Sequence, residues 1–137
     1  MRHSFENLTD AQLSEYSAVI IPSGYVADGL LWLQAEKIAT GELPRISVLM
    51  HRAFYNKRIV KGIICHGMLA LAPTPYLVRG RNVTTNNNVV YAARNMGANV
   101  QVGKDIVVDG TDLVTARAGD LYKEFTEAIV QRILDLN

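Results

Sequence analysis

The stretch Gly62-Ile63-Ile64-Cys65-His66-Gly67 decides how this chain of 137 residues can fold. Ile59 and Val60 extend it upstream, so a mostly apolar run leads directly into a cysteine and, two residues later, a glycine. Such a run is typical of a strand buried on both faces of a parallel sheet. The cysteine and the glycine then predict a nucleophile elbow, a sharp turn between a strand and a helix that exposes a reactive side chain.

Two features of such a turn suit Cys65 to nucleophilic chemistry. The turn holds the sulfur clear of the sheet, and the N-terminus of the following helix stabilises a thiolate. An unreactive, buried thiol is the alternative, because free cysteines are among the most buried residues in proteins. His66 could serve as the base, but adjacent side chains usually diverge, so a structural role fits it equally well. The histidines and the cysteine lack the spacing of metal ligands, so we expect no metal site.

The segments on either side of the elbow alternate between helix and strand, as in a doubly wound α/β sheet. Upstream, the sequence predicts a short helix over residues 10–15, a strand over 18–21 that is apolar on both faces, and a helix over 28–39. The next helix has apolar residues at helical spacing, namely Ile46, Leu49, Met50, Ala53 and Phe54. Downstream we expect a helix over 68–71, a strand over 82–85, a helix over 89–96, a hairpin of 100–102 with 106–108, a turn at Asp109-Gly110, a strand over 112–116 and an amphipathic helix over 120–136, with Asp120 at its start.

Composition excludes several classes of protein. Hydrophobic residues make up 49% and charged residues 20%, as in one folded globular domain. Fourteen basic and thirteen acidic residues give a net charge of +1, which argues against binding to nucleic acid or a membrane surface. A single cysteine excludes a disulfide framework. No apolar run approaches the ~20 residues that span a bilayer, and no signal-peptide core is present, so we expect a cytoplasmic protein.

A second candidate feature, Pro22-Ser23-Gly24-Tyr25, follows the first predicted strand. If the two strands are parallel neighbours, Gly24 and Cys65 share the carboxyl edge of the sheet, where α/β proteins form their sites. The backbone amides of Gly24 and His66 could then form an oxyanion hole, although an ordinary turn is the simpler interpretation. The possible pocket residues are Ser23, Tyr25, Gly67, Asn86 and Arg117. For Asn86 a cap, and for Arg117 an ordinary strand-to-helix connection, is the alternative.

Together these segments resemble the ThiJ/PfpI family (the DJ-one superfamily), in its intracellular cysteine peptidase or amidase-like branch. The matching segments are 20–24, 62–67, 77–85, 107–110 and 113–117, in the family's order and over nearly the whole chain. The resemblance implies an α/β flavodoxin-like sandwich, of the class I glutamine amidotransferase type, with a mostly parallel sheet. It also implies that Cys65 is the nucleophile, His66 the base, and Asp28, from a neighbouring subunit, the acid of a triad. The family's oxyanion amides correspond to Gly24 and His66.

The chain departs from the family pattern in four places. Ser23 replaces one glycine of the usual Pro-Gly-Gly turn, Asp28 stands where the branch usually has glutamate, and residues 34–45 form a longer stretch than the family norm. The chain also begins after the family's first strand–helix–strand region, which supplies a central strand and a glutamate beside the sulfur. We therefore expect residues 1–137 to be one domain that is incomplete at its N-terminus. It could be a fragment, a chain that receives the strand from another chain, or a fold that has re-paired.

The resemblance implies three functions. The first is a cysteine-dependent hydrolase or amidase that acts on a peptide or a small molecule. The second is a glyoxalase-like enzyme that acts on 2-oxoaldehydes. The third is a stress chaperone or redox sensor whose Cys65 is oxidised instead of turning over substrate. In each case we expect no cofactor, no nucleic-acid or membrane partner, and assembly into a homodimer or a higher homo-oligomer.

Overall fold

A four-stranded sheet forms the centre of the computed structural model, which describes residues 4–32 and 35–137 apart from the side chain of Asp28. Its strand order is β1 (Ala18–Ile21), β2 (Val60–Ile64), β6 (Leu113–Ala116) and β5 (Ile106–Asp109). The first three strands run parallel, and β5 pairs antiparallel with β6. A second small sheet pairs β3 (Asn82–Val83) in parallel with β4 (Asn99–Val100). The expected α/β fold with a mostly parallel sheet is therefore confirmed.

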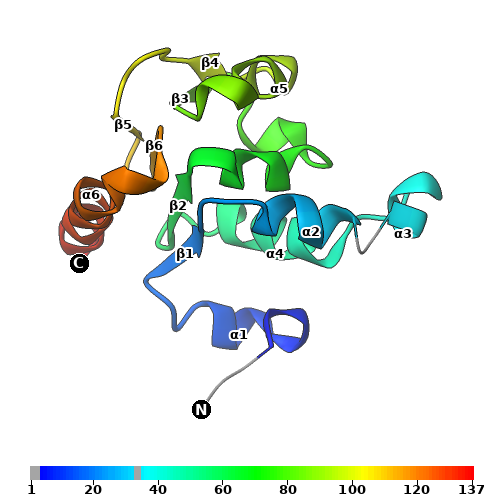
Figure 1. Ribbon diagram of the computed structural model, residues 1–137. Coiled ribbons are helices and arrows are strands. Elements are labelled where there is room, and N and C mark those ends of the chain that lie inside the picture. Colours follow the sequence, from blue (N-terminus) through cyan, green and yellow to red (C-terminus); the bar gives the residue numbers. More distant parts are fainter. Residues whose placement is uncertain (1–3, 33–34) are drawn as a thin grey trace.

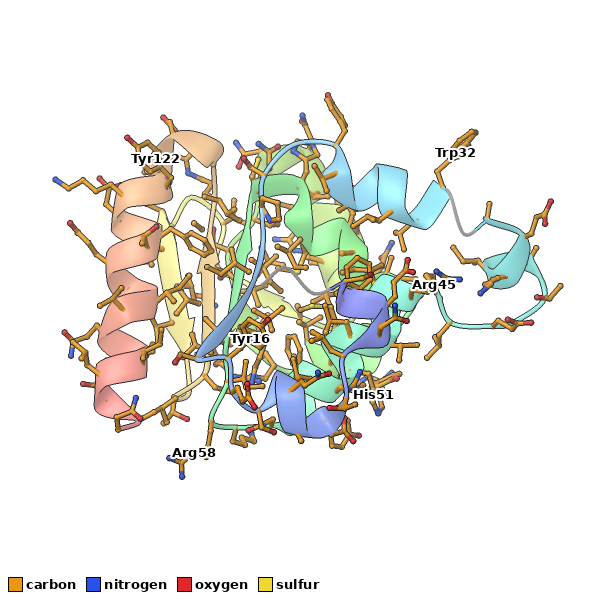
Figure 2. The ribbon with its side chains drawn as sticks, turned by 90° about the horizontal axis from the view of Figure 1, so that it is seen from below. Tyr16, Trp32, Arg45, His51, Arg58 and Tyr122 are labelled. Atoms are coloured by element: carbon orange, nitrogen blue, oxygen red, sulfur yellow. The ribbon has the colours of Figure 1, made fainter. Side chains whose placement is uncertain are left out.

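Helices cover both faces of the main sheet, so the chain forms a three-layer sandwich (Figure 1, Figure 2). The α-helices are α1 (Asp10–Leu13), α2 (Val26–Trp32), α3 (Ala35–Ala39), α4 (Arg45–Tyr55), α5 (Val90–Asn95) and α6 (Tyr122–Asp135). The 3-10 helices are η1 (Phe5–Asn7), η2 (Cys65–Leu71), η3 (Pro75–Leu77), η4 (Asn87–Val89) and η5 (Gly119–Leu121). In Figure 2, α6 lies on one side of the strands, while α1, α2 and α4 lie on the other.

The alternation of side chains along β2 divides the core into two parts. Val60 and Ile64 face α6, where they pack with Phe125 and Ile129. Ile63 faces the opposite layer, where a larger apolar cluster includes Met50 of α4. Successive residues of a strand point to opposite faces, so one buried strand serves both layers. At Gly62 a Cβ would lie 2.5 Å from Cδ1 of Ile129, which shows how closely α6 approaches the sheet.

The apolar spacing of the sequence predicted most of the helices and strands before and after the elbow. The strand over 18–21 and the helix carrying the stripe from Ile46 to Phe54 are confirmed, and the short helix ends at Leu13, slightly earlier than expected. Where one helix over 28–39 was expected, α2 and α3 lie on either side of residues 33–34, which are outside the described residues. The helix expected over 68–71 is the end of the 3-10 helix η2, which already begins at Cys65.

Two further expectations are wrong because the segments pair differently in the fold, and a third differs at the start of the last helix. Only Asn82 and Val83 of the predicted strand 82–85 pair as a strand. The predicted hairpin of 100–102 with 106–108 does not form: the amide of Gln101 donates to Val83 O (2.8 Å), so this segment joins β3 instead. The real hairpin joins β5 to β6: Asp109 pairs with Leu113, so residues 110–112 form a three-residue loop, in which Gly110 has a φ of +60°. Asp120 lies within η5, and Leu121 occupies the N-cap position of α6.

The first strand lies at the edge of the sheet and is not buried on both faces as the sequence predicted. Among the described strands, β1 pairs only with β2, and 48% of the surface of Ile20 is exposed. A cavity of about 230 Å³ lies beside this edge, and its lining is mostly apolar: Phe5, Leu8, Leu13, Tyr16, Ala18, Val19 and Leu49. The sheet is therefore open to a further strand along β1.

A buried group of charges occupies the opposite end of the sheet from the elbow. Lys61 of β2 is fully buried, and its Nζ donates to Oδ2 of Asp112 (2.5 Å) and to the carbonyl of Asn56 (3.1 Å). Arg81 donates from Nη2 to Oδ1 of Asp112 (3.0 Å) and also pairs with Asp109. These contacts tie the start of β6 to β2 and to the loop before β3.

The two cations set the protonation of Asp112. Burial alone would raise the pKa of the Asp112 carboxyl, but the hydrogen bonds and charges of Lys61 and Arg81 outweigh burial and hold it below the usual value. Burial lowers the pKa of Lys61, and its contacts with Asp112 offset that effect only in part. The carboxylate of Asp112 is therefore the ionised anchor of the group at neutral pH.

The lowered pKa of Asp112 predicts a loss of stability in acid. The ionised carboxylate stabilises the folded state in full above the unfolded value of 3.8, and this contribution disappears as the pH falls through the lower folded value. Urea unfolding between about pH 2 and 7 should show this fall, and the Asp112→Asn variant should lack that part of it. Asp10→Asn changes a carboxylate with 88% exposure and is the matched control. Equal acid dependence in the wild type and Asp112→Asn would contradict the assignment.

None of the helices in the described residues combines the length and the apolar composition needed to cross a lipid bilayer.

Candidate active site

The elbow places Cys65 in a strained backbone conformation directly after β2. Its φ is +60°, and within residues 4–32 and 35–137 it is the only residue other than glycine with a positive φ. A left-handed conformation is unfavourable for a residue that has a Cβ, and such strain often occurs at functional sites. Gly67, two residues later, is buried, and a Cβ there would lie 2.9 Å from Pro22 O and 3.0 Å from Ile21 O. The turn therefore packs directly against the end of β1.

Cys65 and His66 face one another, although neighbouring side chains usually diverge. Sγ of Cys65 lies 3.3 Å from Nδ1 of His66, and both residues are half-buried. The left-handed conformation at Cys65 redirects the chain, which allows both side chains to lie on one side of the turn. The ring of Tyr25 lies 5.6 Å from the imidazole, centre to centre, with a tilt of 48°. A thiol, a potential base and an aromatic ring therefore meet at one place.

The loops that follow three neighbouring strands meet at this edge of the sheet. Gly24, with a φ of +88°, belongs to the loop that follows β1, and the His66 amide belongs to the elbow that follows β2. Ser23 lies against the loop that follows β6, since a Cβ at Gly119 would be 2.8 Å from Ser23 Oγ. The two amides predicted to hold an oxyanion thus belong to loops at the same carboxyl edge of the sheet.

Asn86 and Arg117 already have structural partners elsewhere in the fold. Oδ1 of Asn86 accepts a hydrogen bond from the amide of Asn88 (2.9 Å), which caps η4. Arg117 donates to Oδ1 of Asp105 from both Nε (3.1 Å) and Nη2 (2.9 Å). Asp28 lies on α2, but its side chain is outside the described part of the chain. Cys65, His66 and Tyr25 therefore form the group that the structure brings into contact.

One contact at the elbow involves a residue that the sequence did not single out. Oγ1 of Thr85 donates a hydrogen bond to the backbone carbonyl of Cys65 (2.9 Å), and Thr85 is 2% exposed. In the sequence, Thr85 is only the last of three consecutive β-branched residues at the end of the predicted strand over 82–85. Nothing local indicates that this run, twenty positions later, contacts the elbow. In the described residues, no three His, Cys, Asp or Glu side chains gather as metal ligands would.

The chain matches known proteins over nearly its whole length. The profile of the DJ-1/PfpI family matches residues 3–132. An uncharacterized protein of Staphylococcus epidermidis is 32% identical over 127 residues, which are 93% of this chain and 67% of that protein. A two-domain protein of Anabaena variabilis, with DJ-1/ThiJ/PfpI-like and ferritin-like domains, is 26% identical with a TM-score of 0.76. The alignment covers 94% of this chain and 33% of that one.

The crystal structure of a ThiJ/PfpI domain protein from Brachyspira murdochii gives a TM-score of 0.69 at 21% identity. The alignment covers 96% of this chain and 65% of that chain. This likeness supports the flavodoxin-like fold of the family. The chain spans about two thirds of the length of the Staphylococcus and Brachyspira relatives.

Proposed function

The chain belongs to the DJ-1/PfpI family, and from that premise we propose that it is a cysteine-dependent hydrolase with Cys65 as the nucleophile. The proposal is carried by the 3.3 Å contact between Sγ of Cys65 and Nδ1 of His66. A nucleophile and a base within hydrogen-bond reach form the minimal arrangement for covalent catalysis. The positive φ of Cys65 supports it further, because a purely structural cysteine would gain nothing from that strain.

The proposed reaction has two halves. The imidazole of His66 takes the proton of the Cys65 thiol, and the thiolate attacks the carbonyl carbon of an amide or ester. The backbone amides of Gly24 and His66 would stabilise the negative charge that develops on the carbonyl oxygen. The imidazolium then protonates the leaving amine or alcohol, and a thioester remains on Cys65. Water, deprotonated by the same imidazole, cleaves the thioester to release a carboxylic acid and restore the thiol.

A second subunit is part of this proposal. The segment around α2 and α3 carries Asp28, the proposed orienting acid, and it exposes several large apolar side chains: Tyr25, Val26, Trp32, Ile38 and Leu43. Trp32, which is 76% exposed, points away from the body of the molecule at the outer end of α2 (Figure 2). Clusters of exposed apolar residues are typical of protein–protein contacts. We propose that this segment contacts a second copy of the chain in a homodimer or a larger homo-oligomer.

The proposed setting is the cytoplasm. Cys65 is an unpaired, half-buried thiol, and the proposed chemistry requires it in the reduced form. Reducing compartments keep such thiols reduced, whereas secreted proteins usually pair their cysteines.

A glyoxalase-like activity is the second candidate, and it needs only the smaller group of residues. Asn86 and Arg117 are bound to structural partners, which leaves Cys65 and His66 beside Tyr25 for a small substrate. The thiol would add to the aldehyde carbon of a 2-oxoaldehyde to give a hemithioacetal. His66 would move a proton from that carbon to the neighbouring oxygen-bearing carbon, which produces a thioester that water hydrolyses to a 2-hydroxy acid.

The test is a comparison of three treatments of the wild-type protein, read by product formation and by intact mass. With an activated ester or a fluorogenic amide, we expect turnover and a transient acyl adduct on the single cysteine. Turnover of methylglyoxal alone would replace the hydrolase with the glyoxalase-like function. A gain of two oxygen atoms at Cys65 under peroxide, without turnover of either substrate, would point to a redox sensor. His66→Ala is the control, because it keeps the thiol but removes the proposed base.

A further inference from the structure

We propose that Thr85 is a positioning residue for the elbow. By donating its hydroxyl proton to the Cys65 carbonyl, it sets the direction of the peptide unit that joins Cys65 to His66. The inference rests on the proposed function in one respect, the assignment of Cys65 as the reactive group. It extends that function to a residue that neither the catalytic pair nor the oxyanion hole includes.

The geometry of one peptide unit carries the inference. The carbonyl of Cys65 and the amide N–H of His66 belong to the same planar, trans peptide, so they point in opposite directions. Fixing the carbonyl towards Thr85 therefore fixes the His66 N–H away from Thr85. That N–H is one of the two proposed oxyanion donors. The same rotation about ψ of Cys65 also sets how the imidazole lies relative to the sulfur, so a single hydrogen bond governs both parts of the site.

Thr85 is held firmly enough to act in this way. It is 2% exposed, and its hydroxyl lies 2.9 Å from the Cys65 carbonyl oxygen. The preceding residue, Thr84, is fixed on two sides: its amide donates to Oγ1 of Thr115 (2.9 Å), and its hydroxyl donates to Lys104 O (2.6 Å). The hydroxyl of Thr85 is therefore anchored to β6 and to the loop after β4 through its neighbour.

The strained conformation at Cys65 requires such an anchor. A left-handed residue with a Cβ persists only where the surrounding structure over-determines its backbone. Pairing of β2 with β6 ends at Ile64, which lies opposite Ala116, so the sheet does not hold the Cys65 peptide itself. On the far side, the close approach of Gly67 to Pro22 O and Ile21 O fixes the continuation of the turn. Thr85 contacts the Cys65 carbonyl, which lies between these two constraints.

Thr85→Val is the first test, because valine keeps the shape of threonine and removes the hydroxyl. We expect the alkylation of Cys65 by iodoacetamide at pH 7 to slow by about two- to tenfold, the range that one neutral hydrogen bond supports. The ¹H–¹⁵N resonance of the His66 amide should also shift. Because the chain has a single cysteine, every alkyl adduct reports on the elbow. Unchanged alkylation together with an unchanged His66 amide would overturn the inference.

Two matched pairs separate positioning from a general loss of stability. Thr85→Ser and Thr85→Ala lack the same methyl group and differ only in the hydroxyl, so serine should restore the wild-type rate and amide signal while alanine does not. Thr74→Ser and Thr74→Ala remove the same groups from another fully buried threonine, whose hydroxyl has no hydrogen-bond partner among the described residues. They should leave both readouts unchanged, whatever their effect on melting temperature. Equal alkylation rates and equal His66 amide signals in Thr85→Ser and Thr85→Ala would overturn the inference. This comparison remains decisive even if Thr85→Val does not fold.

The same measurements distinguish this inference from the proposed function. If wild-type Cys65 reacts no faster than free cysteine at pH 7, the nucleophile assignment fails, and the His66 amide signal still decides the role of Thr85. If wild-type Cys65 reacts fast and Thr85→Ala reacts equally fast with an unshifted amide, the role of Thr85 fails and the nucleophile assignment stands.

Discussion

Turnover is expected to fall by a factor on the order of 10⁴ to 10⁶ when Cys65 is replaced by alanine, because each candidate reaction passes through a bond to its sulfur. The alanine variant keeps the Cβ and the backbone of the elbow, so the melting temperature should change little. The measurement is the rate of product formation with the substrate that the wild-type protein accepts. Activity within tenfold of the wild type would contradict the role of Cys65 in both the hydrolase and the glyoxalase-like reaction.

The glycine variant of the same residue tests the strain separately from the chemistry. Cys65→Gly also lacks the sulfur, but it removes the Cβ that makes a φ of +60° unfavourable. Relative to Cys65→Ala, we expect its free energy of unfolding to be higher by about 1 kcal/mol. Urea unfolding of the two variants measures this difference without any substrate. A glycine variant that is no more stable than the alanine variant would show that the elbow stores no strain at this position.

The elbow was predictable because its signal is local. An apolar strand, a cysteine and a glycine within six residues predict a sharp turn, and the close approach of Gly67 to Pro22 O gives that glycine a physical reason. The pairing of Cys65 with His66 was not predictable to the same degree. Adjacent side chains face one another here because Cys65 adopts a positive φ. The sequence holds no signal for a positive φ at a residue other than glycine.

Contacts between distant segments explain what the sequence did not predict. Thr85 touches the elbow across twenty positions, and Lys61 meets Asp112 across fifty-one. Lys61 interrupts an apolar run, but a lysine in a strand pattern usually indicates a solvent-facing position and not a buried ion pair. The position of β1 at the edge of the sheet depends on which strands pair. An apolar run has the same sequence pattern in an edge strand and in a central strand, so the sequence did not predict this position.

The exposed edge of β1 bears directly on the proposed site. The elbow packs against the end of β1 through Gly67, and the loop that carries Gly24 continues from that strand. β1 is held by β2 on one side, while its other edge borders an apolar cavity of about 230 Å³. A contact that stabilises the edge of β1 therefore also stabilises the part of the site that packs against β1. We expect the reactivity of Cys65 to fall when β1 becomes less ordered.

The largest expected loss of stability comes from Asp112→Ala. The change leaves the fully buried ammonium of Lys61 without its carboxylate partner and removes one of two carboxylates that hold Arg81. Breaking a buried ion pair by removing one member typically costs about 3–5 kcal/mol, because the remaining charge stays buried without compensation. Urea unfolding at pH 7 measures the change. Asp105→Ala removes the exposed partner of Arg117 and should cost at most about 1 kcal/mol.

The double variant Lys61→Met with Asp112→Leu shows what the ion pair contributes. Replacing both charges with apolar groups of similar volume is often neutral or stabilising, so the double variant should recover most of the loss caused by Asp112→Ala. Lys61 lies opposite Leu113 in the register of β2 with β6, and Asp112 directly precedes that pair. In that case the main role of the ion pair is to fix the register of β6 against β2. The register in turn determines where the two strands end beside the elbow. A double variant as unstable as Asp112→Ala would instead mean that the charges supply net stability.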